Sequence, residues 1–313
     1  MSNSSFGIVF PGQGSQSIGM LSDLAAAHPI VNQTFAEATE ALGYNLWDLV
    51  QNGPEEALNQ TMKTQPAMLA AGVSVWRVWL EQGGDKPQLM AGHSLGEYTA
   101  LVCANVIEFS DAVNLVAERG RFMQEAVPAG SGGMAAILGL DDDQVKSVCV
   151  EAAAGDVIEA VNFNSPGQVV IAGHKQAVDR ACVLAKEAGA KRALPLPVSV
   201  PSHCALMKPA AERLAQLLDE ISINSPTIPV IHNANVALAS DAETIRGELA
   251  AQLYSPVRWV ETVQKMASSG ISSLLEAGPG KVLAGLTKRI DRGLAGLPVY
   301  DTKSLMQALE TLK

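Results

Sequence analysis

Apolar and polar positions in the first 127 residues alternate between short apolar runs and longer segments with helical spacing. Short apolar runs predict buried strands, and apolar residues three and four apart predict helices. The expected elements are strands 6–10 and 88–91 and helices 61–82, 97–105 and 111–127. Strands that alternate with helices are typical of a parallel sheet covered by helices.

A different rhythm begins after the turn-rich segment 128–133, where the pattern predicts the order β-α-β-β-α-β. The turn at 164–167 makes the two central strands a hairpin. The expected elements are strand 134–138, helix 141–153, strands 157–163 and 168–172, helix 174–188 and strand 191–196. This order favours a small ferredoxin-like subdomain inserted between two linkers. The alternative is that these elements continue one sheet.

The pattern returns to helices and short strands from residue 205 onward. We therefore predict an α/β protein with a large lobe formed by residues 1–127 and 200–313. The inserted subdomain is expected to span residues 128–199.

Composition narrows the class of protein. The 313 residues are 48% hydrophobic, which indicates a substantial buried core. A formal net charge of -10 argues against nucleic acid as a partner, because a phosphate-backbone binder needs a concentrated positive face. No uninterrupted apolar stretch of about 18 residues predicts a membrane helix, and no basic region precedes the first apolar run. We expect a cytoplasmic protein that does not bind membranes.

The four cysteines lack the close spacing of zinc ligands. We expect buried, reduced thiols and no metal site. These cysteines are Cys103, Cys149, Cys182 and Cys204.

A Gly-x-Ser-x-Gly motif at 92–96 is the strongest chemical signal in the chain. The expected strand before it and helix after it suit a strained strand-to-helix turn that exposes the hydroxyl of Ser94 for nucleophilic attack. The alternative is that Ser94 only caps the following helix.

A nucleophilic serine needs a base, and His203 is the best candidate among five histidines. It lies in a loop at the exit from the inserted segment, where the two lobes must meet. The alternative is a helix-terminal residue whose ring bonds to the backbone. We expect a solvated role for His28, a packed role for His93 and a capping role for His174, whereas His232 follows an apolar strand and is harder to dismiss.

Developing negative charge on a substrate carbonyl needs two hydrogen-bond donors. The N–H of Leu95 is one candidate, and the glycine-rich loop 11–16 offers the N–H of Gln13 as the second. The same loop could suggest a dinucleotide site, but Ser17 occupies the position of the third glycine, and no suitably placed acidic residue follows.

Arg119 falls in register with apolar residues at helical spacing, which is compatible with a side chain directed inward. Few acidic residues occur nearby to pair with it, so a substrate carboxylate is a reasonable hypothesis for its partner. The pattern alone favours the alternative, a solvated arginine on the helix surface.

Several separated motifs together resemble the malonyl-CoA:acyl carrier protein transacylases of bacterial type II fatty acid synthesis. They occur in the right order over almost the whole chain, at 10–16, 92–97, 161–166, 202–203, 252–253 and 256–257. The resemblance implies an α/β fold with a hydrolase-like large lobe, built on a short parallel sheet, and an inserted ferredoxin-like subdomain.

The resemblance also implies a role for each matching residue. Ser94 would become the malonylated nucleophile, and His203 would serve as base and acid. Arg119 would bind the malonyl carboxylate, and the main-chain carbonyl of Gln252 would orient the histidine. Gln13 and Leu95 would form the oxyanion hole, and Asn162 would lie near the substrate.

The implied reaction transfers a malonyl group from malonyl-CoA to the phosphopantetheine thiol of acyl carrier protein, with ping-pong kinetics and no cofactor. It would supply extender units for fatty acid synthesis. Basic residues on one late helix are candidates for contact with an acidic carrier protein, although a solvated helix face explains them as well. These residues are Lys281, Lys288 and Arg289.

Two other functions stay open. A serine thioesterase or esterase would use the same site but accept water. A binding module for coenzyme A or a carrier protein would keep the fold without the chemistry.

Overall fold

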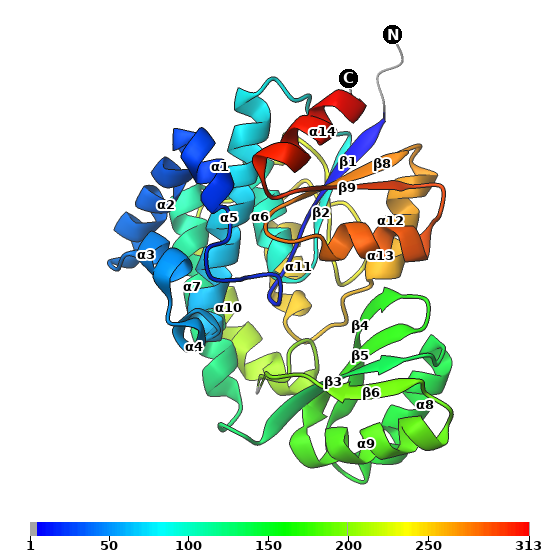
Figure 1. Ribbon diagram of the computed structural model, residues 1–313. Coiled ribbons are helices and arrows are strands. Elements are labelled where there is room, and N and C mark those ends of the chain that lie inside the picture. Colours follow the sequence, from blue (N-terminus) through cyan, green and yellow to red (C-terminus); the bar gives the residue numbers. More distant parts are fainter. Residues whose placement is uncertain (1–4, 199, 313) are drawn as a thin grey trace.

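Every residue of β1 (Phe6–Phe10) is buried, as expected for a central strand that helices cover on both faces. The computed structural model describes residues 5–198 and 200–312. In this part of the chain, five strands pair in parallel in the order β7-β2-β1-β8-β9 (Figure 1). The remaining strands of this sheet are β2 (Leu89–Gly92), β7 (Val230–Ile231), β8 (Ser273–Ala277) and β9 (Ala295–Val299).

Alternate side chains of β1 enter two different cores because successive residues of a strand face opposite sides of a sheet. Ile8 and Phe10 pack into the larger core, and Val9 packs into the core on the other face. The second core is formed with α12 (Trp259–Ser268) and α13 (Val282–Ile290).

Ten α-helices and one 3₁₀ helix among the described residues contribute to the larger core. They are α1 (Ser22–Ala27), α2 (Pro29–Leu42), α3 (Leu46–Asn52), α4 (Glu55–Leu58), α5 (Thr61–Glu81), α6 (Leu95–Cys103), α7 (Phe109–Ala126), η1 (Ala205–Met207), α10 (Lys208–Glu220), α11 (Ala242–Gln252) and α14 (Thr302–Leu312).

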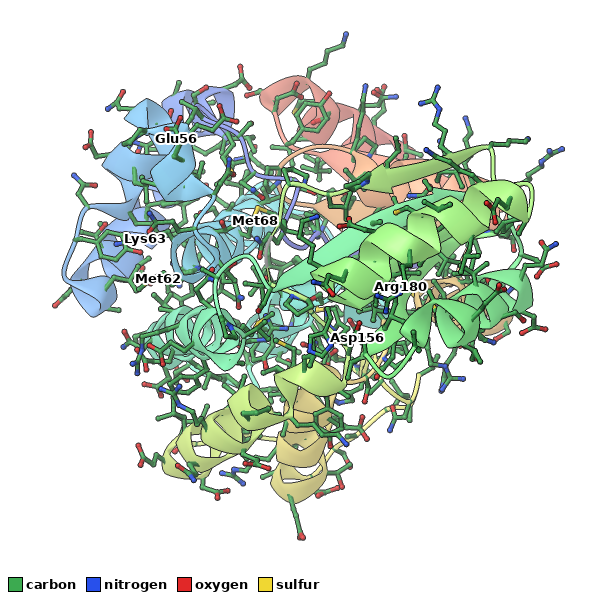
Figure 2. All side chains as sticks on the ribbon, turned by 90° about the horizontal axis from the view of Figure 1, so that it is seen from below. Glu56, Met62, Lys63, Met68, Asp156 and Arg180 are labelled. Atoms are coloured by element: carbon green, nitrogen blue, oxygen red, sulfur yellow. The ribbon has the colours of Figure 1, made fainter. Side chains whose placement is uncertain are left out.

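A second sheet is antiparallel and has the strand order β4-β5-β3-β6. Its elements follow one another as β3 (Gly132–Leu138), α8 (Asp142–Ala153), β4 (Ile158–Ser165), β5 (Gln168–His174), α9 (Lys175–Glu187) and β6 (Arg192–Pro195). Ile137 and Ile171 pack with α8 and α9 on one face. An ion pair of 2.7 Å between Arg180 and Asp156 ties α9 to the segment after α8, and Figure 2 shows the two side chains together.

The opposite face of the small sheet contacts the large lobe. Val161 and Val170 pack there against Cys204. The main chain also joins the two parts, because the Phe163 N–H donates to Val257 O at 3.0 Å and the Val257 N–H donates to Val161 O at 2.8 Å. The small sheet is therefore hydrogen-bonded to the segment that leads into α12.

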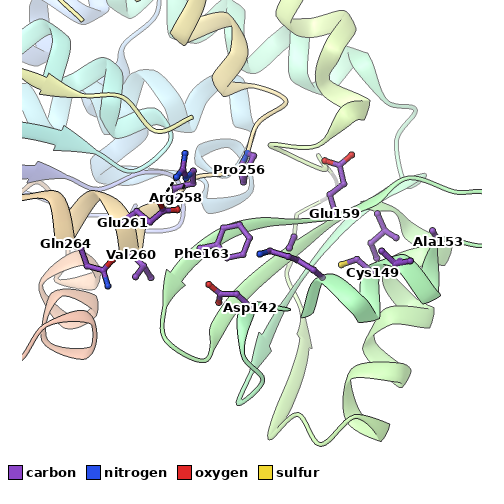
Figure 3. Close-up of a pocket in the computed structure, with 14 residues that line it drawn as sticks. Asp142, Cys149, Ala153, Glu159, Phe163, Pro256, Arg258, Val260, Glu261 and Gln264 are labelled. Atoms are coloured by element: carbon purple, nitrogen blue, oxygen red, sulfur yellow. Dashed lines mark hydrogen bonds and ion pairs between the residues drawn. The ribbon is translucent and has the colours of Figure 1, made fainter. Parts of the chain in front are cut away.

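A cavity of about 860 Å³ opens beside this junction (Figure 3). It lies between α8 and β4 on one side and the start of α12 on the other, with Phe163 and Arg258 among its lining residues. Within the described part of the chain its lining includes no serine and no histidine. This cavity is therefore separate from the expected site with Ser94 and His203.

The predicted fold class is confirmed, with a parallel sheet and a separate antiparallel sheet in the β-α-β-β-α-β order. The boundaries of most elements differ from the predicted ones by one or two residues, and the differences around Ser94 matter most for the site. The second strand is 89–92 rather than 88–91, and the helix after it begins at Leu95 rather than at 97. The earlier start leaves only two residues between strand and helix, so the turn is tighter than the hydrophobic pattern indicated.

The four cysteines are free and buried, as predicted. Among the residues described, no helix combines the length and apolarity that spanning a membrane requires.

Candidate active site

Ser94 lies at the tip of the turn between β2 and α6, with φ 50° and ψ -110°. This left-handed conformation is strained for a residue with a side chain. The flanking glycines let the main chain pass close by. A Cβ on Gly92 would stand 1.8 Å from the carbonyl carbon of Gly96, and a Cβ on Gly96 would stand 2.1 Å from Phe10 O. The Ser94 side chain makes no capping hydrogen bond, so the capping alternative is wrong.

The parallel pairing of β1 with β2 brings the glycine-rich loop to this turn. Phe10 is in register with Gly92, so the two strands end at the same edge of the sheet. A Cβ on Gly12 would lie 2.5 Å from His93 O, which shows how closely the loop follows the turn. Gln13 and Leu95 line a cavity of about 130 Å³ together with Ser94.

His203 reaches the same cavity from the loop that follows the small sheet. Its Nε2 lies 2.8 Å from Ser94 Oγ, and its Nδ1 lies 2.8 Å from the main-chain oxygen of Gln252. A carbonyl oxygen can only accept, so Nδ1 carries the proton and Nε2 presents its lone pair to the serine hydroxyl. The main-chain N–H of His203 also donates to Leu253 O at 2.9 Å, which holds the loop in place.

Burial and the positive charge of Arg119 lower the pKa of His203 to about 3. The imidazole is therefore neutral near pH 7, which is the form that can accept a proton from Ser94. Burial raises the pKa of the thiols, to about 12 for Cys149 and Cys204. These cysteines remain protonated and poorly nucleophilic.

Arg119 is 1% exposed and points inward from α7. Its guanidinium donates to two amide oxygens at 2.8 Å, from Nη1 to Gln65 Oε1 and from Nη2 to Gln252 Oε1. Nη2 also lies 3.5 Å from Ser94 Oγ, and no partner for Nε is found in the part of the chain that the structure describes. None of these contacts is a carboxylate, so a positive charge stands beside the hydroxyl without a direct counter-ion.

Asn162 lies on β4 and lines the cavity from the side of the small sheet. Its Oδ1 is buried, and among the described residues it has no hydrogen-bond partner. Asn162 therefore brings an acceptor without a partner among the described residues to the wall of the cavity on the side of the small sheet.

The other histidines have separate surroundings. His93 Nε2 lies 2.8 Å from Asn164 Oδ1, and the ring packs against Trp259, which agrees with the packed role expected for it. The capping role expected for His174 is wrong, because its side chain makes no cap bond and its Nδ1 instead accepts from the Val157 N–H at 3.1 Å.

Sequence reasoning missed three side chains that hold this site together. Gln65 binds Arg119, Asn233 Oδ1 accepts the Ser94 N–H at 2.7 Å, and the Glu97 carboxylate accepts from Gln252 Nε2 at 2.7 Å. Asn233 follows β7, whose end lies at the same sheet edge as Ser94, so topology could have pointed to it. Gln65 lies inside an apolar helix and carried no comparable signal.

Comparison with known proteins places the chain in a family. A family model described as an acyl transferase domain matches residues 8–300. The malonyl CoA-acyl carrier protein transacylase of Escherichia coli (strain K12) is 60% identical over 305 residues, which cover 97% of this chain and 99% of that protein. The chain belongs to the malonyl-CoA:acyl carrier protein transacylase family.

More distant transacylases and solved structures agree with this membership. The transacylase of Bacillus subtilis (strain 168) is 45% identical over 311 residues, covering 99% of this chain and 98% of that protein. The structure of the Coxiella burnetii transacylase has a TM-score of 0.98 at 54% identity, covering 99% of this chain and 98% of that one. A type II PKS acyl-carrier protein in complex with its malonyl-transacylase gives a TM-score of 0.97 at 60% identity, covering 98% of this chain and 100% of that one.

Proposed function

We propose that this protein transfers a malonyl group from malonyl-CoA to acyl carrier protein through a malonyl-serine intermediate. One observation carries the proposal: Ser94 Oγ contacts His203 Nε2 at 2.8 Å, beside a buried guanidinium that no carboxylate of the described residues contacts. Relatives 60% identical over nearly the whole chain are malonyl CoA-acyl carrier protein transacylases. The enzyme is therefore an acyltransferase that supplies extender units for fatty acid synthesis.

In the first half-reaction, Ser94 Oγ attacks the thioester carbonyl while His203 Nε2 takes the hydroxyl proton. An oxygen–carbon bond forms, the carbon–sulfur bond breaks, and the proton passes from His203 to the departing thiolate of coenzyme A. Coenzyme A leaves as the thiol, and the malonyl group remains as an ester on Ser94.

In the second half-reaction, the phosphopantetheine thiol of acyl carrier protein attacks the malonyl ester. His203 takes the thiol proton and returns it to Ser94 Oγ as the oxygen–carbon bond breaks. Malonyl thioester and free serine result, so each transfer restores the enzyme. No cofactor is needed because a thioester is already activated.

The remaining site residues take roles that follow from where they lie. The N–H groups of Leu95 and Gln13 are proposed to stabilise the oxyanion, because both residues line the Ser94 cavity. Arg119 is proposed to bind the malonyl carboxylate, which would supply the missing counter-ion. Gln252 orients His203 through its main-chain oxygen, and Asn162 would donate from its amide or accept at Oδ1 toward the substrate.

The two lobes are proposed to keep the expected ranges. Residues 1–127 with 200–313 would form the large lobe and 128–199 the small subdomain; residues 1–4, 199 and 313 lie outside the described part. The proposal is supported by the strands of the antiparallel sheet, which all fall within 132–195. A cytoplasmic location is proposed from the four free, buried thiols.

Intact mass after mixing with malonyl-CoA tests the function. We expect one added malonyl group, mapped to the peptide that contains Ser94, and its loss when phosphopantetheinylated acyl carrier protein is added, with the malonyl group recovered on the carrier. Rapid release of free malonate without carrier protein would favour the thioesterase or esterase alternative, which the relatives do not support. No adduct at all would favour a binding module.

A further inference from the structure

The carboxylate of Glu97 accepts three hydrogen bonds in the interior of the large lobe. His232 Nδ1 lies 2.7 Å from Oε1, and the Asn233 N–H at 3.0 Å and Gln252 Nε2 at 2.7 Å both reach Oε2. The Glu97 side chain is 0% exposed. The carboxylate is buried, and hydrogen-bond donors from two distant segments replace the water that it would otherwise bind. One segment contains His232 and Asn233, and the other contains Gln252.

One of these segments holds the main chain around the nucleophile. Asn233 Oδ1 accepts the Ser94 N–H at 2.7 Å, and Asn233 Nδ2 donates to Gly92 O at 2.7 Å. The Asn233 side chain therefore holds the main chain where it leaves β2 and enters the strained turn. Glu97 fixes Asn233 by accepting its main-chain N–H.

The other segment holds the base and the guanidinium. The main-chain oxygen of Gln252 binds His203 Nδ1, and its side-chain Oε1 binds Arg119. Its Nε2 donates both to Glu97 and to the main-chain oxygen of Ser94, at 3.0 Å. Gln252 is 0% exposed, so its side chain has no water to replace these partners.

His232 is the ionisable partner of the carboxylate. Burial disfavours its protonated ring, but the hydrogen bond and the charge of Glu97, with Glu248 nearby, prevail and raise the pKa of His232. Within the described residues, neither the His232 side chain nor the Glu97 side chain is hydrogen-bonded to Ser94 or His203; only the main-chain N–H of Glu97 donates to Ser94 O, at 3.0 Å. The side chains of this buried pair therefore take no direct part in the proposed transfer steps.

We propose that Glu97 is a positioning residue for the transfer reaction, acting on His203 through Gln252 and on the Ser94 turn through Asn233. In a Ser-His-Asp triad the carboxylate binds the histidine directly. Here the carboxylate stands one residue further away and holds the amide residue whose carbonyl orients the ring. The proposal rests on the function proposed above.

Reaction with phenylmethylsulfonyl fluoride isolates the Ser94–His203 pair, because this reagent carries no carboxylate and does not need Arg119. Ser94 Oγ would form a bond to sulfur, the sulfur–fluorine bond would break, and the proton would leave through His203 with fluoride. The rate of sulfonylation, followed by intact mass, is compared with the rate of malonylation at saturating malonyl-CoA.

Four variants complete the experiment: Glu97→Gln, Gln252→Met, the double variant and Glu276→Gln. Gln252→Met keeps the main-chain oxygen on His203 but removes the side-chain hydrogen bonds to Glu97, Arg119 and Ser94 O. Glu276 is the matched control, because it is also 0% exposed and its carboxylate accepts from the N–H groups of Leu283 and Ala284 at the start of α13. The unfolding temperature of each variant shows which are folded.

We expect Glu97→Gln to slow both reactions about 10- to 100-fold, with little change in the malonyl-CoA concentration at half saturation. The double variant should sulfonylate faster than the product of the two single effects predicts, because both changes break the Glu97–Gln252 hydrogen bond. Glu276→Gln should react at the wild-type rate even if it unfolds at a lower temperature.

A folded Glu97→Gln that reacts at the wild-type rate overturns the proposal, as does a double variant in which the two effects multiply or a Glu276→Gln that slows equally. If Glu97→Gln does not fold, Gln252→Met decides, and wild-type sulfonylation in it overturns the proposal. A wild-type protein that is sulfonylated on Ser94 but takes up no malonyl group would refute the proposed function and leave the inference about Glu97 testable.

Discussion

Ser94 Oγ and His203 Nε2 lie 2.8 Å apart although the two residues are 109 positions apart in the chain. Ser94 is delivered by the turn after a central strand, and His203 by the loop that leaves the small sheet. The inserted subdomain therefore lies between the nucleophile and its base in sequence. Folding brings these two residues into contact.

Replacing the nucleophile should abolish covalent acylation. Ser94→Ala removes the only atom that can form the ester in the proposed mechanism, so we expect malonyl transfer to fall by roughly 10⁴-fold or more. Intact mass after mixing with malonyl-CoA should show no adduct. Ser147→Ala, an exposed helix serine, is the control and should acylate normally; equal acylation of both variants would refute the assignment of Ser94.

Removing the guanidinium should change acyl selectivity. Arg119→Ala should lower malonyl transfer by about 10²- to 10⁴-fold, because two charge-assisted hydrogen bonds to the carboxylate are lost. Acetyl transfer should be kept or increased, since an acetyl group has no charge to bind. The ratio of the two kcat/KM values is the measurement, and an equal loss for both acyl groups would indicate a structural arginine.

The acid limb of the pH profile should lie far below the usual range of histidine. Burial and Arg119 hold the pKa of His203 at about 3, so the base stays neutral when pH falls through 6.5. We expect the rate of Ser94 sulfonylation to show no protonation step near pH 6.5. A half-maximal rate close to pH 6.5 would contradict this expectation and place the histidine in contact with water.

The same depressed pKa links folding to pH. Between the unfolded pKa of 6.5 and the folded pKa of about 3, the unfolded chain binds a proton that the folded protein does not. This contribution is complete above pH 6.5, and the free energy of unfolding should fall as pH drops through that window. Urea unfolding at a series of pH values should show a smaller fall in the free energy of unfolding for His203→Gln than for the wild type. Parallel curves for the two proteins would contradict this contribution of His203.

Replacing Gly92, which has no room for a side chain, tests the Ser94 turn, and Gly247, which has open space around it, is the control. A Cβ on Gly92 would meet the Gly96 carbonyl group at 1.8 and 1.9 Å, so Gly92→Ala must displace the Ser94 turn and should destabilise the protein and abolish activity. Gly247 lies in α11, and a Cβ there meets nothing within 4 Å. Gly247→Ala should stabilise the protein by about 0.5–1 kcal/mol.

Thermal unfolding and malonyl transfer measure both variants. A Gly92→Ala protein with wild-type transfer would show that the turn tolerates a wider approach than the structure has. A destabilised Gly247→Ala would show that the α11 position is not an ordinary helix interior.

The elements of the fold were accessible from the sequence because each pattern is local. Runs of apolar residues mark β1 and β2, and the change from alternating strands and helices to the β-α-β-β-α-β order marks the small sheet. The exact start of α6 was not accessible, because Ser94 and Leu95 have no periodic signal and the tight turn depends on the space that Gly92 and Gly96 leave.

The site was accessible only in part. Motif and family resemblance named Ser94, His203 and Arg119, and residue types explain why such groups are needed. They could not reveal that Gln65 and Gln252 hold the guanidinium, or that Glu97 binds Gln252, because amides and a buried acid inside helices carry no local signal of their partners.

The sequence by itself determined which chemistry is possible: a hydroxyl between spaced glycines, a histidine to accept its proton and a cation for a carboxylate. Tertiary structure decided which groups meet and in what state. Parallel pairing placed the ends of β1, β2 and β7 at one edge, and burial set the protonation of His203 and left Arg119 without an ionic partner among the described residues. Contact and desolvation depend on segments far apart in the chain, and no local pattern encodes them.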